Sequence, residues 1–250
     1  MRVISVISGK GGVGKTTITA NLSAALTKFG FNVTAIDANL TTPNLGIHFG
    51  LHLADITLHD ILKNAELLKK GIYIYPGGLK VIPGSLKVEN IIDVDTSNLG
   101  KIISNLNSDF VFIDSAAGLG REALASLSVA DEILVVTNPD IPSLTDALRA
   151  IKVAETVGKS IKGIVLNRVG RSRDELKKVD VESFLSYPVI AQIPEDPWVL
   201  RSINERKPLI FLNPNSKAAI EIQNLALAII GSKYRIKQSF IDKLFSWIRI

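Results

Sequence analysis

The stretch that decides the fold is SGKGGVGKTT, residues 8–17, which directly follows the apolar run VISVI at residues 3–7. It fits the pattern G-x-x-x-x-G-K-[ST], in which a glycine-rich loop joins a buried strand to a helix. The backbone N–H groups of such a loop converge on phosphate oxygens, and the helix N-terminus adds a favourable dipole. The pattern therefore predicts a phosphate-binding loop at the carboxyl end of the first strand.

Two side chains of this loop carry the predicted chemistry. Lys15 is placed to neutralise the β- and γ-phosphates of a nucleotide, and the Thr16 hydroxyl is placed to ligate the Mg²⁺ that bridges them. The other residues expected to contact the nucleotide are Gly11, Gly12, Val13, Gly14 and Thr17. A phosphate loop needs one lysine, so the second lysine, Lys10, requires a separate explanation.

The composition indicates a globular protein and removes several kinds of chemistry. The chain has 250 residues, of which 46% are apolar and 21% are charged, as in ordinary globular domains. It contains no Cys, which excludes disulfides, thiolate metal sites, iron–sulfur clusters and cysteine nucleophiles. We expect neither a signal peptide nor a membrane-spanning helix, because the first apolar run is short and no long uncharged apolar window follows.

Short apolar runs alternate with amphipathic stretches along the chain. The predicted strands are 3–7, 32–36, 110–113, 132–137, 162–167 and 187–193, and the predicted helices are 15–29, 97–107, 121–129, 143–157, 174–185, 197–205 and 216–230. The strands are continuously apolar, as in parallel sheets that are covered on both faces. The alternation predicts a doubly wound, mostly parallel α/β sheet in one domain, 1–231, followed by a C-terminal segment, 232–250.

Several local patterns are given ordinary structural roles. Pro76-Gly77-Gly78 predicts a turn between short strands. Residues 171–178, RSRDELKK, are interpreted as the solvated start of a helix. His48, His52 and His59 lack partners at metal-site spacing, so we interpret them as surface or helix-packing residues.

The exact form KGGVGKTT resembles the deviant Walker A motif of the MinD/ParA superfamily of dimeric ATPases. Further segments resemble that superfamily and look very much like its archaeal MinD members: DANLTTPNLG (37–46) at switch I, FIDSAAGLGREA (112–123) at Walker B and switch II, VTNPDIPSLTDALR (136–149), IVLNRVGRS (164–172) and IAQIPEDP (190–197). The resemblance covers nearly the whole chain. It implies a P-loop ATPase fold, ATP and Mg²⁺ as ligands, and an ATP-dependent homodimer.

The resemblance also assigns roles to individual residues. It implies that Lys10 reaches across the dimer to the phosphates bound by the other subunit, and that Asp37 and Asp114 hold or orient the Mg²⁺ shell. A cation in that position stabilises the charge that spreads in the transition state. The alternative for Lys10 is a solvated loop charge. Three residues are expected near the adenine and its ribose: Asn167, Pro194 and Asp196.

Two positions depart from the superfamily pattern. Ala116 stands where many relatives have a proline in switch II, which implies a small change in loop stiffness. Asn39 stands where switch I commonly has a second aspartate that orients the attacking water. An amide accepts a hydrogen bond but neither takes a proton nor supplies negative charge. One hypothesis is therefore slow hydrolysis, and the alternative is that water positioning alone suffices.

The C-terminal segment has a pattern of its own. Residues 233–250 carry a net charge of +4, whereas the preceding residues sum to about +1. The segment 234–250 predicts a basic amphipathic helix, with Lys243 beside an apolar arc formed by Phe240, Ile241, Leu244, Phe245, Trp247 and Ile248. Such a helix is typical of an interfacial membrane anchor, and MinD proteins carry one at this end. The alternative is a helix that packs on the body of the domain.

These features favour one function over several others. The leading hypothesis is a MinD-type ATPase that dimerises with ATP, binds the inner face of the cell membrane from the cytoplasm and positions an unidentified protein partner, at the division site or in similar spatial regulation. The alternative is a ParA-like ATPase that binds DNA nonspecifically, but the near-neutral body lacks the dispersed basic surface which that function needs. Iron–sulfur carrier ATPases of related fold are excluded by the absence of Cys. A metabolic ligase or kinase of this fold stays an open alternative, because no substrate pocket can be argued from the sequence.

Overall fold

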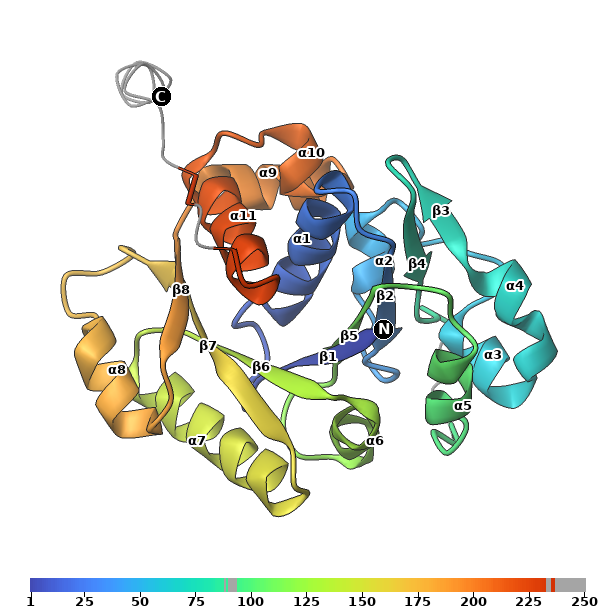
Figure 1. Ribbon diagram of the computed structural model, residues 1–250, viewed down its shortest axis with the longest axis horizontal. Coiled ribbons are helices and arrows are strands. Elements are labelled where there is room, and N and C mark those ends of the chain that lie inside the picture. Colours follow the sequence, from blue (N-terminus) through green and yellow to red (C-terminus); the bar gives the residue numbers. More distant parts are fainter. Residues whose placement is uncertain (88, 90–93, 233–234, 237–250) are drawn as a thin grey trace.

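The computed structural model describes residues 1–87, 89, 94–232 and 235–236, and it contains one eight-stranded sheet (Figure 1). The strand order is β3-β4-β2-β5-β1-β6-β7-β8. The strands are β1 (Arg2–Ile7), β2 (Val33–Ala38), β3 (Tyr73–Tyr75), β4 (Leu79–Ile82), β5 (Phe110–Ser115), β6 (Glu132–Thr137), β7 (Ser160–Val169) and β8 (Val189–Pro194). All neighbouring strands pair in parallel except β3, which runs antiparallel to β4 at one edge.

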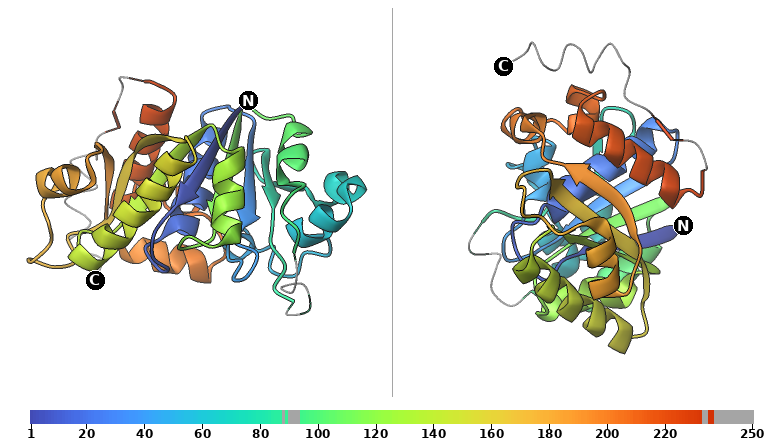
Figure 2. Two further views of the ribbon diagram at one scale, coloured as in Figure 1. Left: turned by 90° about the horizontal axis from the view of Figure 1, so that it is seen from below. Right: turned by 90° about the vertical axis from the view of Figure 1, so that its left-hand side faces the viewer.

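Helices cover both faces of this sheet (Figures 1 and 2). One layer contains α1 (Lys15–Lys28), α2 (Leu45–His48), α9 (Pro197–Asn204), α10 (Leu209–Leu212) and α11 (Lys217–Ile229). The other layer contains α3 (Leu58–Lys63), α5 (Leu99–Ser104), α6 (Arg121–Val129), α7 (Ile141–Thr156) and α8 (Lys178–Leu185), with the short η1 (Ala65–Leu67) and α4 (Leu68–Gly71) beside α3. The arrangement confirms the predicted doubly wound α/β fold.

The strands are apolar along their whole length because successive side chains enter different cores. In β5, Phe110 and Phe112 pack into the core beneath α1 and α11, whereas Val111 and Ile113 pack into the core beneath α3 and α5. A third buried cluster lies between α7 and the strands β6, β7 and β8. Burying both faces of the central strands fixes the carboxyl ends of β1, β2 and β5 rigidly beside one another.

All six predicted strands and the seven predicted helices are present, with ends that differ by up to four residues. The turn at 76–78 does join two short strands, β3 and β4. The prediction for 171–178 is wrong: α8 begins at Lys178, and the preceding segment is a loop. The carboxylate of Glu175 accepts the backbone N–H groups of Gly170, Arg171 and Ser172, and these bonds stabilise the loop instead of a helical turn.

The first strand lies at the centre of the sheet, between β5 and β6. In doubly wound sheets, ligands bind beyond the carboxyl ends of the strands where the strand order reverses. Three loops leave the sheet at that edge: the phosphate loop (8–15), the switch I loop (39–44) after β2, and the switch II loop (116–120) after β5.

The predicted C-terminal helix falls mostly on residues 237–250, which lie outside the described residues. Two residues of the segment after α11, Arg235 and Ile236, contact side chains of α11. Arg235 pairs with Glu221, and the backbone of Ile236 exchanges two hydrogen bonds with the Asn224 side chain. Within the described part of the chain, no helix is both long and apolar enough to cross a bilayer.

Candidate nucleotide-binding site

The phosphate loop has a conformation and a packing that only glycine permits at two positions. Gly14 has φ of 101°, in the region that side chains rarely adopt, and a Cβ there would lie 2.2 Å from the Asn167 amide nitrogen. A Cβ on Gly9 would lie 1.9 Å from the backbone oxygen of Asp146 in α7. The loop therefore lies directly against β7 and α7, and Asn167 stabilises it further by donating to the Val13 carbonyl over 2.7 Å.

The charged groups behind the loop are buried together. Lys15 is 7% exposed, while Asp37 and Asp114 are fully buried and face each other in register on β2 and β5. Burial lowers the pKa of Lys15, and the two carboxylates counteract that effect. Burial also raises the pKa of Asp114 to about 6, against the opposing influence of the Thr16 hydroxyl and Lys15. The pKa of Asp37 is raised well above its usual value by burial and by Asp114.

These residues fit a Mg²⁺–nucleotide. Both side-chain oxygens of Asp114 are buried without a hydrogen-bond partner, which is costly unless a ligand supplies one. The Thr16 hydroxyl affects the pKa of Asp114, so the predicted direct ligand lies beside these free oxygens. Within the described residues, no cluster of three or more His, Cys, Asp or Glu could hold a metal alone. Mg²⁺ at phosphate sites needs only one or two protein ligands in addition to the phosphates.

Asp37 differs from Asp114 because its oxygens already have partners. Its two oxygens accept the backbone N–H groups of Asn39 at 3.3 Å and Leu45 at 2.8 Å. The carboxylate therefore fixes both ends of the switch I loop as well as facing Asp114. Asp37 is thus suited to orient the metal shell through water, and Asp114 is the carboxylate with free lone pairs.

Asn39 closes a small turn inside the switch I loop. Its amide nitrogen donates to the Thr42 carbonyl over 2.7 Å, and its oxygen accepts from the Thr42 N–H and hydroxyl at 3.3 and 3.1 Å. An aspartate at this position could accept the two bonds from the Thr42 N–H and hydroxyl, but it could not donate to the Thr42 carbonyl. The asparagine is therefore matched to this turn, which gives it a structural role besides its predicted role beside the attacking water.

The two lysines of the phosphate loop have different environments. Lys15 is buried among carboxylates, whereas the Lys10 side chain is exposed at the start of the loop. Among the described residues, Lys10 forms no ion pair. Its backbone carbonyl accepts from the Ser8 hydroxyl over 2.7 Å, which helps to fix the loop while its ammonium group remains free for another molecule.

The remaining predicted nucleotide residues lie on two neighbouring strand ends. Asn167 is on β7 beside the phosphate loop, and Pro194 ends β8. Asp196 is buried, and its oxygens accept the N–H groups of Trp198 and Ala218. The side chain thus joins the starts of α9 and α11, so any contact with adenine or ribose stays a prediction.

No sequence signal singled out one further residue of this edge, Glu122. It lies in the first turn of α6, and its carboxylate accepts the N–H groups of Leu40 and Thr41 and the Thr41 hydroxyl. Its only sequence cue is its place within the segment 112–123 that resembles Walker B and switch II, which does not reveal a contact with a loop 82 residues away.

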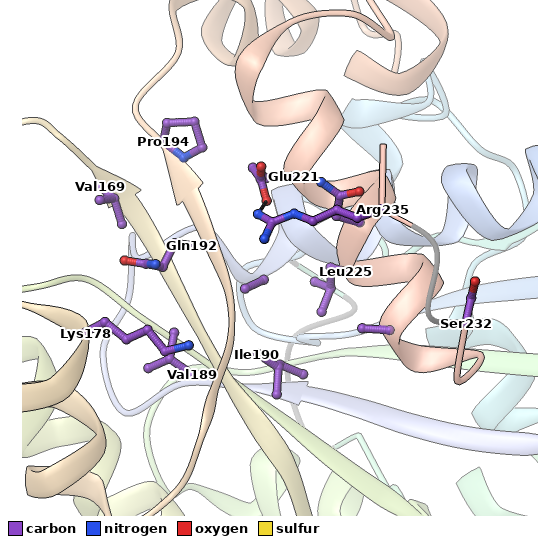
Figure 3. Close-up of a pocket in the computed structure, with 13 residues that line it drawn as sticks. Val169, Lys178, Val189, Ile190, Gln192, Pro194, Glu221, Leu225, Ser232 and Arg235 are labelled. Atoms are coloured by element: carbon purple, nitrogen blue, oxygen red, sulfur yellow. Dashed lines mark hydrogen bonds and ion pairs between the residues drawn. The ribbon is translucent and has the colours of Figure 1, made fainter. Parts of the chain in front are cut away.

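A separate cavity of about 560 Å³ lies on the other side of β8, between that strand and α11 (Figure 3). It is lined by Val189, Ile190 and Leu225 together with Lys178, Gln192 and the Glu221–Arg235 ion pair. Neither the phosphate loop nor Asp37 or Asp114 contributes to its wall. Ser232 and Arg235 of the C-terminal segment also line it, as does Pro194, one of the predicted nucleotide residues.

The histidines do not form a metal site. His48 and His59 are buried, and His52 lies beside Arg206, with 3.0 Å between the two side-chain nitrogens. Burial lowers the pKa of His48 to about 4, so this side chain is neutral at physiological pH. Their interpretation as surface or packing residues agrees with the structure.

A parallel sheet, a glycine-rich loop between its central strand and a helix, and two buried carboxylates beside the loop lysine define a P-loop nucleotide-binding protein. The family model of the CobQ/CobB/MinD/ParA nucleotide-binding domain matches residues 4–209. The chain belongs to this family of ATPases, as its motifs predicted.

This chain is similar to other proteins over nearly its whole length and theirs. An uncharacterized ATP-binding protein of Methanocaldococcus jannaschii is 38% identical over 247 residues, which cover 96% of this chain and 94% of that protein. The crystal structure of the cell division ATPase MinD from Pyrococcus furiosus has a TM-score of 0.88 and 39% identity, covering 92% of this chain and 98% of that one. The likeness to MinD confirms the predicted α/β fold over the 92% of the chain that it covers.

A third likeness bears on the ligand. The septum site-determining protein MinD of Pyrococcus horikoshii, solved in complex with Mg-ADP, has a TM-score of 0.86 and 37% identity and covers 93% of this chain and 99% of that one. It supports the binding of nucleotide and Mg²⁺ in this family generally. Another member, the MinD of Aquifex aeolicus, has been solved in complex with MinC, so family members also bind protein partners.

Proposed function

We propose that this protein is a MinD-like switch that binds ATP and Mg²⁺ at the phosphate loop, dimerises in the ATP-bound state and hydrolyses ATP within the dimer. The observation that carries the proposal is the contrast between the two loop lysines. Lys15 is buried against two carboxylates, and Lys10 is exposed without an ion-pair partner among the described residues. A second subunit docked over the loop would bring another nucleotide within reach of Lys10.

The residues of the site divide the work of phosphoryl transfer, which consists mainly of positioning and charge stabilisation. Lys15 and the loop N–H groups hold the β- and γ-phosphates, and Lys10 stabilises charge on the phosphates of the partner. Mg²⁺ would be held by Thr16 and Asp114 and would supply positive charge that neutralises the phosphates. Asp37 orients its shell, and Asn39 positions the attacking water without accepting its proton. We expect slow hydrolysis, because no carboxylate replaces that last function.

We further propose that the ATP-bound dimer attaches to anionic membranes through the C-terminal segment and there positions a partner protein at the division site or in similar spatial regulation. Each basic residue near an anionic surface contributes about 1 kcal/mol, and each large apolar side chain that is well buried contributes roughly 1.5–3 kcal/mol. Ordering a short helix offsets much of that gain. Two tails on one dimer therefore bind far better than one, so ATP controls attachment by controlling dimerisation.

Light scattering coupled to size exclusion tests the dimer. We expect the wild-type mass to double with Mg²⁺ and a non-hydrolysable ATP analogue and to stay monomeric with ADP. Lys10→Ala should remain monomeric or dimerise weakly with the ATP analogue and with ADP. Lys28→Ala, which removes an exposed lysine at the far end of α1, is the matched control and should behave as the wild type. A wild-type mass that does not respond to ATP would contradict the proposal.

Sedimentation with anionic liposomes tests the membrane part. We expect the protein to pellet with the liposomes in ATP and not in ADP. A chain truncated after Ile236 should not pellet with either nucleotide. Equal pelleting with both nucleotides would keep the anchor but remove nucleotide control. If no pelleting occurs and the tail-deleted protein is retained on DNA in a salt-sensitive manner, the ParA-like alternative replaces this function.

A further inference from the structure

The peptide groups on both sides of Leu40 are held by side chains from two different helices. The Leu40 N–H donates to the Glu122 carboxylate over 2.8 Å, and the next N–H, of Thr41, donates to the same oxygen over 3.3 Å. The other Glu122 oxygen accepts from the Thr41 hydroxyl. On the opposite side, the Leu40 carbonyl lies 3.0 Å from Nε2 of His59 in α3. Leu40 is thus bonded through both its N–H and its carbonyl.

The hydrogen bonds of His59 fix which ring nitrogen carries the proton. Its Nδ1 lies 3.1 Å from the backbone N–H of Ser85, and because that N–H can only donate, Nδ1 accepts. Nε2 must then carry the proton and donate to the Leu40 carbonyl. The ring is fully buried, and burial lowers its pKa, so the neutral form with both bonds is the stable one.

Leu40 lies at the boundary between the buried and the exposed part of the switch I loop. The Leu40 side chain is 2% exposed within the core beneath α3 and α5, whereas Thr41 and Thr42 are exposed. Only two residues, Ala38 and Asn39, separate Leu40 from Asp37. Glu122 lies two residues after the switch II loop (116–120), in the first turn of α6, where a carboxylate is also stabilised by the helix dipole.

We propose that Glu122 is a positioning residue: together with His59 it fixes the Leu40–Thr41 backbone, and it thereby places Asn39 relative to the phosphates and couples the switch I loop to the start of α6. The kinetic part of this inference rests on the proposed ATP hydrolysis. The structural part concerns the loop alone. Small displacements of positioning groups cost large factors in rate, so losing Glu122 lowers kcat more than it weakens nucleotide binding.

Hydrogen exchange measures the structural part without any nucleotide. In Glu122→Ala we expect the Leu40 and Thr41 amides to exchange at least about tenfold faster than in the wild type, because exchange reports local opening. Glu182→Ala is the matched control, since Glu182 also accepts a backbone N–H, that of Val189 over 2.8 Å, but lies in α8 away from the switch loops. It should leave the exchange at residues 40 and 41 unchanged.

Steady-state kinetics measure the positioning role. Glu122→Ala should lower kcat by about tenfold with KM changed less than about twofold. Glu122→Gln, which keeps one carbonyl oxygen as an acceptor, should have a kcat between those of Glu122→Ala and the wild type. Thr41→Ser, which keeps the hydroxyl, should behave as the wild type, and Thr41→Val should lower kcat in part. Circular dichroism on each variant checks that the fold is retained.

The outcomes separate this inference from the function on which it rests. Unchanged exchange at residues 40 and 41 in both Glu122 variants overturns the inference, as does faster exchange with an unchanged kcat. A kcat loss of equal size in Glu182→Ala overturns it too. If the wild type binds ATP but does not hydrolyse it, the proposed function fails while the exchange experiment still decides the structural contact.

Discussion

The two switch loops flank the same phosphate site but are held very differently. The switch I loop is bonded by Asp37 at both ends, by Glu122 and His59 at Leu40, and by the Asn39–Thr42 turn inside it. Among the described residues, the switch II loop has a Gly118 N–H bond to the Ser8 carbonyl and a Ser115 hydroxyl bond to its first carbonyl. Most of its residues are exposed.

The difference indicates which loop responds to nucleotide. Moving Leu40 would break bonds to two helices and expose a buried side chain, whereas moving the switch II loop breaks little. Segments that open easily are those with few buried contacts and exposed backbone. We therefore expect the switch II loop to move on ATP binding while the Leu40–Thr41 backbone stays fixed.

The largest effect is expected from replacing Lys15, the buried lysine of the phosphate loop. Lys15→Ala should weaken nucleotide binding by more than about 100-fold, because it removes a charge-assisted contact to the phosphates at a buried position and leaves Asp37 and Asp114 without their cation. Isothermal titration with Mg²⁺–ADP measures this, with Lys28→Ala as the control. An affinity within a few-fold of the wild type would place the phosphates elsewhere.

Asn39 tests the chemistry of switch I directly. Asn39→Asp should raise turnover by about tenfold, because it supplies the negative charge that orients the water; general bases typically contribute factors of about 10²–10⁴. The gain is limited because the carboxylate cannot donate to the Thr42 carbonyl and loosens the turn. A phosphate-release assay on both proteins decides the point, and an equal rate would mean that positioning alone governs hydrolysis.

The unpaired carboxylate of Asp114, near the end of β5, should make the nucleotide-free protein pH-sensitive. A carboxyl whose pKa is higher in the folded state adds stability at low pH, and that contribution is lost as pH rises through the folded value, about 6 for Asp114. Asp114→Asn should therefore raise Tm at pH 7.5 by roughly 2–10 °C, because the wild type has to ionise a carboxyl whose pKa burial raises, whereas the amide stays neutral.

The comparison that isolates Asp114 is the difference in Tm between wild type and Asp114→Asn across pH 5 to 8. The difference should widen as pH rises, because only the wild type has to ionise this buried carboxyl. The variant should also lose its response to Mg²⁺–ADP. A constant difference at all pH values would show that Asp114 stays in one protonation state.

The smallest effect is expected from stiffening switch II. Ala116→Pro should raise Tm by about 1–3 °C, because proline restricts the unfolded chain by about 0.4–1 kcal/mol where the native backbone accepts it. Ser115 precedes it at the end of β5, in the extended conformation that proline favours in its neighbour. Differential scanning calorimetry checks this, and a fall in Tm would mean that the loop needs another conformation at residue 116.

The sequence sufficed for the sheet, the main helices and the phosphate loop because each has a strong local signal. Continuous apolar runs predicted β1, β5 and β6, and the glycine–lysine pattern placed Lys15 and Thr16 at the start of α1. The short helices α2, α3, α4 and α10 have no such signal, because pieces of four to six residues form through tertiary packing.

The part of the site that sequence reasoning missed is made of long-range contacts. Glu122 binds a loop 82 residues away, and His59 lies 19 residues from the Leu40 carbonyl that it contacts. Neither spacing follows a helical or strand period, so no pattern connects these residues. The resemblance did supply Asp37, Asp114 and Asn167, but only the structure shows that Asn167 holds the phosphate loop and that Asp37 bonds both ends of switch I.

Lys10 is proposed to act on the nucleotide of another subunit. This action is tested most directly by measuring ATP turnover per molecule as the protein concentration is varied, using the wild type and Lys10→Ala. Action across a dimer predicts that wild-type turnover per molecule rises with concentration and reaches a plateau once all subunits are paired, while Lys10→Ala stays low throughout. A wild-type rate per molecule that is the same at every concentration down to the most dilute would show that Lys10 does not act across a dimer.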